Sequence, residues 1–192
     1  MSIVLASASP RRRELMQMLG VQDLKIIPAV GEEKAPDAHS PAELVKALAA
    51  HKAREVALQA GPEDIIIAAD TIVWHRGCVF GKPHSEAEAA DMLRALSGES
   101  HAVYTGVAVL RGDTLLSECE RSAVHFRPLT EREISAYIAT GEPMDKAGAY
   151  GIQGRGAMLV EGIRGDYFTV VGLPVCALAQ ALKRYGIDPL EP

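Results

Sequence analysis

Residues 5–15 read LASASPRRREL and contain the change from strand to helix on which the fold depends. The apolar run at residues 3–6 predicts a strand, and the residues after it have the features of a helix start. Ser9 suits the N-cap, Pro10 suits the first helical position, and Glu14 supports the first turns. This stretch therefore predicts a β-strand followed directly by an α-helix.

The start of this helix carries three consecutive arginines, Arg11, Arg12 and Arg13. Helix N-termini present unpaired N–H groups and a partial positive charge, so they bind anions. A solvated basic turn explains one arginine easily but three poorly, because cations oppose the helix dipole at this end. Arginine also makes bidentate contacts to phosphate. We therefore predict a phosphate site at this end of the helix.

The composition indicates a globular protein that handles small molecules. The 192 residues are 48% hydrophobic, which is enough to bury a sizeable core in a single domain spanning residues 1–192. The formal charge of −5 argues against a binder of nucleic acid polymers, so an anion site must be local. The sequence shows neither a membrane span nor a signal peptide. Cys78, Cys119 and Cys176 lack zinc-site spacing, and we expect buried, reduced thiols in a cytoplasmic protein.

Strand-like and helix-like segments alternate early in the chain, which predicts an α/β fold. We expect strands at residues 3–6, 25–28, 65–69, 102–110, 114–124 and 156–160. We expect helices at residues 10–19, 41–58, 85–96, 131–139 and 175–185. Ser40 and Thr130 precede two of these helices, with Glu43 and Glu133 in their first turns. An antiparallel hairpin around residues 111–113 makes the expected sheet mixed, twisted and flanked by helices.

A buried apolar strand at residues 65–69 leads into Asp70 and Thr71. The carboxyl ends of strands are where α/β folds commonly place ligands. Asp70 can bind a hard divalent cation or act as a general base, and Thr71 can reach a ligand oxygen. A lone aspartate at a strand end more often caps a turn, but this one lies between apolar residues and needs a partner. We therefore favour a functional role for Asp70.

Two lysines and one glutamine are weak candidates when each is taken singly. Lys82 lies in the rigid turn FGKP at residues 80–83, and Lys52 lies within an expected helix. Gln153 lies in a glycine-rich segment, residues 145–157, which has neither Walker nor Rossmann spacing. Its amide offers a donor and an acceptor together, as reading the edge of a nucleobase requires.

Taken together, these segments resemble the Maf family of nucleoside triphosphate pyrophosphatases. The matching stretches run from residue 5 to residue 174 and are LASASPRRREL, AADTIV, GKP, LSGESHAVYTGVAV, residues 145–157 and GDYFTVVGLP. The resemblance implies an elongated, two-lobed Maf/ITPase-like fold with a central cleft. It also implies hydrolysis of the α–β phosphoanhydride to a monophosphate and pyrophosphate, with Mg²⁺ or Mn²⁺ as cofactor.

The resemblance assigns catalytic and specificity roles to individual residues. The catalytic aspartate of the family, its proton acceptor, falls on Asp70. The specificity positions fall on Arg11, Thr71 and Gln153. Arg11 and Arg12 match the family's arginine pair, whereas the third arginine of the run is expected to be solvated. The Asp-Thr pair and the DKAGAYGIQG segment look like the branch that acts on dTTP and UTP.

The triphosphate and metal site of the family uses a serine, an acidic residue and two lysines, which match Ser7, Glu32, Lys52 and Lys82. Glu33 is an alternative for the acidic position, and Glu32 is the better match. The resemblance implies that the metal bridges phosphate oxygens to this glutamate and to the catalytic aspartate.

Other functions stay open at this point. A sibling branch of the family prefers 7-methyl-GTP and differs at the matched positions. A kinase or transferase requires a P-loop or an acceptor site, and the sequence shows neither. A regulator of cell division, an activity associated with the family, predicts nucleotide binding without turnover. A homodimer is common in such enzymes, and the six histidines have no metal-ligand spacing.

Overall fold

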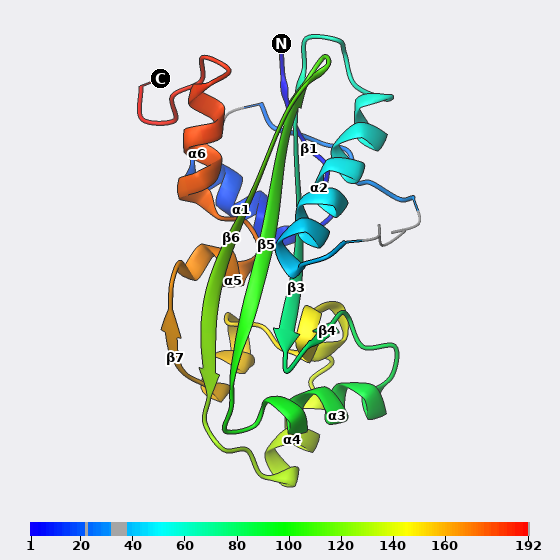
Figure 1. Cartoon of the computed structure of the whole chain (residues 1–192), viewed down its shortest axis with the longest axis vertical. Helices are drawn as coiled ribbons and strands as arrows, with labels where there is room; N and C mark the ends of the chain where they lie inside the picture. Colours follow the sequence, from blue (N-terminus) through cyan, green and yellow to red (C-terminus); the bar gives the residue numbers. More distant parts are fainter. Residues whose placement is uncertain (22, 32–37, 192) are drawn as a thin grey trace. The chain divides into compact units, whose positions relative to one another are not determined.

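The computed structural model describes residues 1–21, 23–31 and 38–191 (Figure 1). Within them, seven strands form one sheet in the order β2-β1-β3-β5-β6-β7, with β4 paired to β3. The strands are β1 (Ile3–Leu5), β2 (Lys25–Ile26), β3 (Ile65–His75), β4 (Cys78–Phe80), β5 (Ser100–Arg111), β6 (Thr114–Phe126) and β7 (Val160–Arg164).

Six α-helices accompany the sheet in the described part of the chain, and none of its helices is long and apolar enough to cross a membrane. They are α1 (Pro10–Met18), α2 (Pro41–Ala57), α3 (Glu86–Leu96), α4 (Glu131–Ile138), α5 (Tyr167–Val171) and α6 (Val175–Lys183). Three short 3₁₀ helices follow α4, namely η1 (Glu142–Asp145), η2 (Ala147–Ala149) and η3 (Gly154–Leu159).

The sheet combines parallel and antiparallel pairs, as predicted. β1 pairs in parallel with β2 and with β3, whereas β4 and β7 run antiparallel to β3 and β6. β5 and β6 are neighbours joined by a tight turn in which Gly112 has a φ of +52°. The mixed α/β fold and the predicted hairpin are therefore confirmed.

Hydrogen bonds at the helix starts explain why α2 and α4 begin where they do. The Ser40 hydroxyl accepts from the backbone N–H of Glu43 at 3.2 Å. Thr130 and Glu133 form a complete capping box at the start of α4. Ser9 occupies the N-cap of α1 with an extended backbone, but its side chain makes no capping hydrogen bond within the described chain. The predicted position of this helix start, with Ser9 at the N-cap and Pro10 in the first turn, is confirmed.

Two sequence-based expectations about elements, and one about the cysteines, are corrected by the structure. β3 continues to His75, so Asp70 lies inside the strand and not at its end. The reason is that residues 72–74 are again apolar and that residues 73–75 pair with β4. The strand expected at residues 156–160 is mostly the 3₁₀ helix η3, and β7 begins only at Val160. The cysteines are free as expected, but Cys78 and Cys176 are exposed, so their predicted burial is wrong.

The chain forms two compact units. Unit 1 consists of residues 1–70, 105–120 and 172–192. Unit 2 consists of residues 71–104 and 121–171. The long strands β3, β5 and β6 each contribute residues to both units, so neither unit is a continuous piece of the chain.

Unit 1 is built on a close contact between α2 and the sheet (Figure 1). Small side chains of α2, such as Ala49 and Ala53, pack against Ile66 of β3 and neighbouring strand residues. At Gly106 of β5, an added Cβ would lie 2.3 Å from the carbonyl oxygen of Val45. Only glycine permits this approach, because the obstacle is helix backbone and cannot rotate away.

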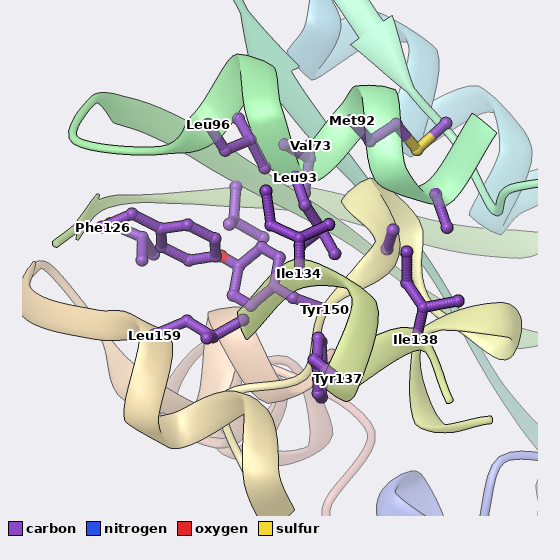
Figure 2. Close-up of a cluster of buried hydrophobic side chains, with 14 residues drawn as sticks. Val73, Met92, Leu93, Leu96, Phe126, Ile134, Tyr137, Ile138, Tyr150 and Leu159 are labelled. Atoms are coloured by element: carbon purple, nitrogen blue, oxygen red, sulfur yellow. The ribbon is translucent and has the colours of Figure 1, made fainter. Parts of the chain in front are cut away.

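Unit 2 has a separate apolar core, shown in Figure 2, in which side chains of α3 and α4 pack with strand residues. Phe126 and Tyr150 meet edge to face at its centre, with ring centroids 4.7 Å apart. His101 belongs to the same aromatic group, and its Nε2 lies 2.7 Å from the Tyr150 hydroxyl oxygen. A histidine without an assigned role is thus part of the core, with 4% of its surface exposed.

This burial predicts a pH-dependent stability. Burial lowers the pKa of His101 to about 3 from its ordinary value of 6.5, since charging it would strand a cation in the core. Because the unfolded chain binds this proton more readily, the stabilisation is complete above about pH 6.5 and is lost as the pH falls toward 3. The free energy of unfolding should fall by about 1.4 kcal/mol per pH unit from this residue in that range.

Urea unfolding of the wild-type chain and of His101→Gln, at pH values between 7.5 and 4.5, measures this effect. The variant should be less stable overall but should show a shallower decline with acid. His84→Gln, at an exposed position, serves as the matched control and should keep the wild-type slope. Parallel curves for the wild-type chain and His101→Gln would contradict the assignment.

Candidate active site

The predicted phosphate end of α1 is organised by Ser7 and Arg12. The buried Ser7 hydroxyl accepts from the backbone N–H of Ser9 at 3.2 Å and from Nη1 of Arg12 at 3.3 Å. Nε of Arg12 donates to the carbonyl of Gly172 at 2.8 Å. Two fixed partners thus orient one guanidinium at the helix start, which lowers the entropy lost when it binds an anion. Arg11 is half-buried beside it.

The second cluster of unit 1 is an ion pair between Lys52 of α2 and Asp70 of β3. Nζ of Lys52 donates to Oδ1 of Asp70, and the two side chains are only 15% and 10% exposed. A carboxylate buried this deeply is costly unless it is paired, so the lysine accounts for its burial. The expectation that Asp70 needs a partner is therefore met.

The pairing itself was not predicted, because Lys52 was assigned to phosphate. A signal for it exists in the sequence. Lys52 lies between Ala49 and Val56 on the apolar side of α2, where a lysine is unusual without a buried anion. Asp70 is the acidic residue within the otherwise apolar start of β3. Each of the two charged residues lies in an apolar surrounding because it is paired with the other.

Thr71, Lys82 and Gln153 all belong to unit 2. Thr71 is half-buried and directly follows Asp70, so the alternation of a strand directs the two side chains to opposite faces of the sheet. Lys82 is exposed, and Gln153 is half-buried at the residue preceding η3. Within unit 1 the structure thus joins Ser7 with Arg12 and Lys52 with Asp70, with Arg11 next to Arg12, whereas Thr71, Lys82 and Gln153 belong to unit 2.

The turn that carries Lys82 and the glycine-rich segment that carries Gln153 are bonded to each other. The backbone N–H of Gly148 donates to the carbonyl of Gly81 at 3.0 Å. Gly148 has a φ of +69°, and an added Cβ would lie 2.8 Å from a methyl group of Val73. Glycine is therefore required here by both conformation and space. This segment is a series of packed turns, in contrast to a simply flexible loop.

Glu32 and Glu33, the two candidates for the acidic ligand, lie outside the described residues. The chain just before them is held by a residue that sequence reasoning missed. The Glu55 carboxylate of α2 accepts from the N–H groups of Val30 and Gly31 at 2.7 and 2.9 Å. These two hydrogen bonds also hold the pKa of Glu55 below its ordinary value. Glu55 lies about one helical turn from Lys52 in α2. It therefore anchors the chain up to Gly31 near Lys52.

The oxygen donors among the described residues suit a divalent cation that binds together with a phosphate ligand. Among the described residues, no group of three or more His, Cys, Asp or Glu side chains could hold a metal. Mg²⁺ does not need such a cage, because it keeps several waters and takes one or two carboxylates together with substrate phosphates. The Asp70 carboxylate is a hard oxygen donor of this kind. The residues present therefore fit Mg²⁺ or Mn²⁺ bound as a complex with a triphosphate.

Comparisons with known proteins show which proteins this chain is similar to. The family model described as "Maf-like protein" matches residues 2–185. A dTTP/UTP pyrophosphatase of Bacillus cereus (strain ZK / E33L) is 49% identical over 186 residues, 97% of this chain and 96% of the relative. A dTTP/UTP pyrophosphatase of Bacillus cereus (strain AH820) is 48% identical over the same shares. A solved nucleoside-triphosphatase / dITP/XTP pyrophosphatase of Mycobacterium abscessus covers 100% of this chain and 98% of its own, with 15% identity and a TM-score of 0.45, which is too distant to bear on the fold.

Proposed function

The chain belongs to the Maf family, and from this premise we propose that it hydrolyses dTTP and UTP to the monophosphate and pyrophosphate. The observation that carries the proposal is the buried Lys52–Asp70 pair, because the resemblance to the family assigns its proton acceptor to Asp70. The Arg12 guanidinium, already oriented by Ser7 and Gly172, supports it as a phosphate ligand.

The reaction requires a proton acceptor for the attacking water and cations for the phosphates. As the water oxygen bonds to phosphorus, the α–β phosphoanhydride bond breaks and pyrophosphate leaves with the electron pair. Asp70 positions this water and takes up its proton, while Lys52 holds the carboxylate in place. Arg11, Arg12 and Lys82 bind the triphosphate oxygens and offset their charge.

A divalent cation completes the proposed chemistry. Glu32 and Asp70 would hold Mg²⁺ or Mn²⁺, which when bound supplies charge stabilisation to the phosphates. Selection of a pyrimidine rests on Gln153 and Thr71, whose hydrogen-bonding groups match the edge of uracil or thymine. The free cysteines are consistent with a cytoplasmic location, where thiols stay reduced.

A substrate panel tests this function. Purified protein is given dTTP, UTP, CTP, GTP and 7-methyl-GTP with increasing Mg²⁺ or Mn²⁺, and pyrophosphate release is measured with a coupled pyrophosphatase. We expect dTTP and UTP to be the best substrates by at least about tenfold in kcat/KM, and EDTA to abolish turnover. Preference for 7-methyl-GTP would move the chain to the sibling branch. Nucleotide binding without turnover would indicate a regulator and overturn the proposal.

A further inference from the structure

The segment that carries Gln153 is tied to one acid–phenol pair, Tyr137 of α4 and Glu142 of η1. Oε1 of Glu142 accepts from the Tyr137 hydroxyl at 2.9 Å and from the N–H of Gly156 at 3.1 Å. Oε2 of the same carboxylate accepts from the N–H of Arg155 at 3.0 Å. One side chain therefore fixes the backbone immediately after Gln153.

The phenol of the pair fixes the backbone on the other side. The Tyr137 hydroxyl accepts from the N–H of Gly151 at 3.2 Å, two residues before Gln153. Tyr137 itself is 5% exposed and belongs to the unit 2 core, where Figure 2 shows it among the buried side chains. The hydrogen bonds that flank Gln153 thus lead back to a rigid, packed element and not to solvent.

The glycines of this segment lie directly against the pair. An added Cβ at Gly156 would lie 2.5 Å from the Tyr137 hydroxyl and 2.2 Å from the carbonyl oxygen of Gly151. At Gly154 it would lie 2.8 Å from Oε2 of Glu142. Each glycine therefore allows the backbone to approach the pair closely enough to hydrogen-bond. A segment that was glycine-rich only for flexibility would not need this fit.

The charge of Glu142 is required by this geometry. Burial by itself raises the pKa of Glu142, but the hydrogen bonds from Gly156, Arg155 and Tyr137, together with the charge of Lys146, hold the pKa below its ordinary value. An ionised carboxylate accepts at both oxygens, whereas an amide accepts at one end and donates at the other. Replacing Glu142 by glutamine would turn one acceptor into a donor facing another donor, and at least one bond would be lost.

We propose that Glu142 and Tyr137 are positioning residues for base selection, which hold Gln153 in the orientation that distinguishes uracil from cytosine. This inference rests on the proposed function and deepens it. The pair touches the backbone on both sides of Gln153, so it acts through that residue and takes no part in breaking the phosphoanhydride. Loosening it should therefore change discrimination between bases more than the rate of the chemical step.

The test compares UTP with CTP, which differ at the base edge that Gln153 is proposed to read. In Glu142→Gln and in Tyr137→Phe, the ratio of kcat/KM for UTP over CTP should fall about fivefold, the effect of about one hydrogen bond. The change should appear mainly as a higher KM for UTP, with kcat near the wild-type value. Glu161→Gln, which makes the same chemical change at an exposed position of β7, should leave the ratio unchanged.

A double-mutant cycle separates positioning from a general structural effect. If Glu142 acts through Gln153, Glu142→Gln should lower the ratio in the wild-type background and have little further effect on Gln153→Ala. Additive losses, or equal losses of rate for both nucleotides with an unchanged ratio, would overturn the inference.

Amide hydrogen exchange gives a readout that does not depend on activity. The N–H groups of Gly151, Arg155 and Gly156 should exchange faster in Glu142→Gln than in the wild-type chain, by about fivefold or more, while α3 keeps its protection. Wild-type protein that fails to hydrolyse UTP would overturn the proposed function, even with this change in exchange. Unchanged exchange in the variant would overturn the positioning role, even in an active enzyme.

Discussion

Asp70→Asn should retain the fold and release pyrophosphate from UTP about 10²–10³-fold more slowly than the wild-type chain. The amide keeps an oxygen that can accept from Lys52, so the buried hydrogen bond between residues 52 and 70 can still form. It cannot take up the proton of the attacking water, and it offers a cation no negative charge. The expected size is that of removing one preorganised electrostatic group, about 2.7–4 kcal/mol of transition-state stabilisation.

Initial rates with UTP at saturating Mg²⁺ measure this loss, and thermal unfolding followed by circular dichroism checks the fold. Asp113→Asn makes the same change in the exposed turn between β5 and β6 and should keep wild-type activity. Activity of Asp70→Asn within a few fold of the wild-type value would remove Asp70 from the catalytic role.

Gly106→Ala should lower the free energy of unfolding by about 3 kcal/mol, the upper range for overpacking a tight contact. The added Cβ would lie 2.3 Å from the Val45 carbonyl oxygen and 2.8 Å from the backbone nitrogen of Lys46. Because both atoms are backbone, α2 itself must shift away from the sheet. This shift would also displace Lys52 from Asp70, so activity should fall together with stability.

Urea unfolding measures the stability change, and UTP hydrolysis under native conditions measures the change in activity. Gly162→Ala is the matched control, because an added Cβ there meets no atom within 4 Å. If Gly106→Ala proved as stable as Gly162→Ala, α2 would not be seated on β5 in the way described.

The features that could be predicted from the sequence are those encoded by neighbouring residues. Thr130 and Glu133 lie three positions apart and cap α4 as expected, and the hairpin around residues 111–113 forms where its turn residues indicate. The end of β3 could not be predicted in this way. Asp70 and Thr71 interrupt the apolar pattern, yet pairing with β4 carries the strand through them to His75.

In the candidate site, too, the local patterns could be predicted from the sequence, whereas the contacts between distant residues could not. The arginine-rich helix start was predicted from a local pattern, but its fixed geometry depends on Gly172, 160 positions away from Arg12. The Lys52–Asp70 pair and the hydrogen bond from the Val30 N–H to Glu55 likewise join residues 18 and 25 positions apart. Such contacts depend on how the helices pack on the sheet. The identity of a single residue does not show which distant residue it will contact.

The hydrogen bond between Arg12 and Gly172 also bears on how the protein is made. Arg12 is added to the growing chain 160 residues before Gly172. At about 5–20 residues per second, Arg12 lacks this partner for roughly 8–32 s of synthesis. Unit 1 therefore cannot close before residue 172 has been added. A chain truncated before Gly172 would lack the carbonyl that orients Arg12 at the proposed phosphate site.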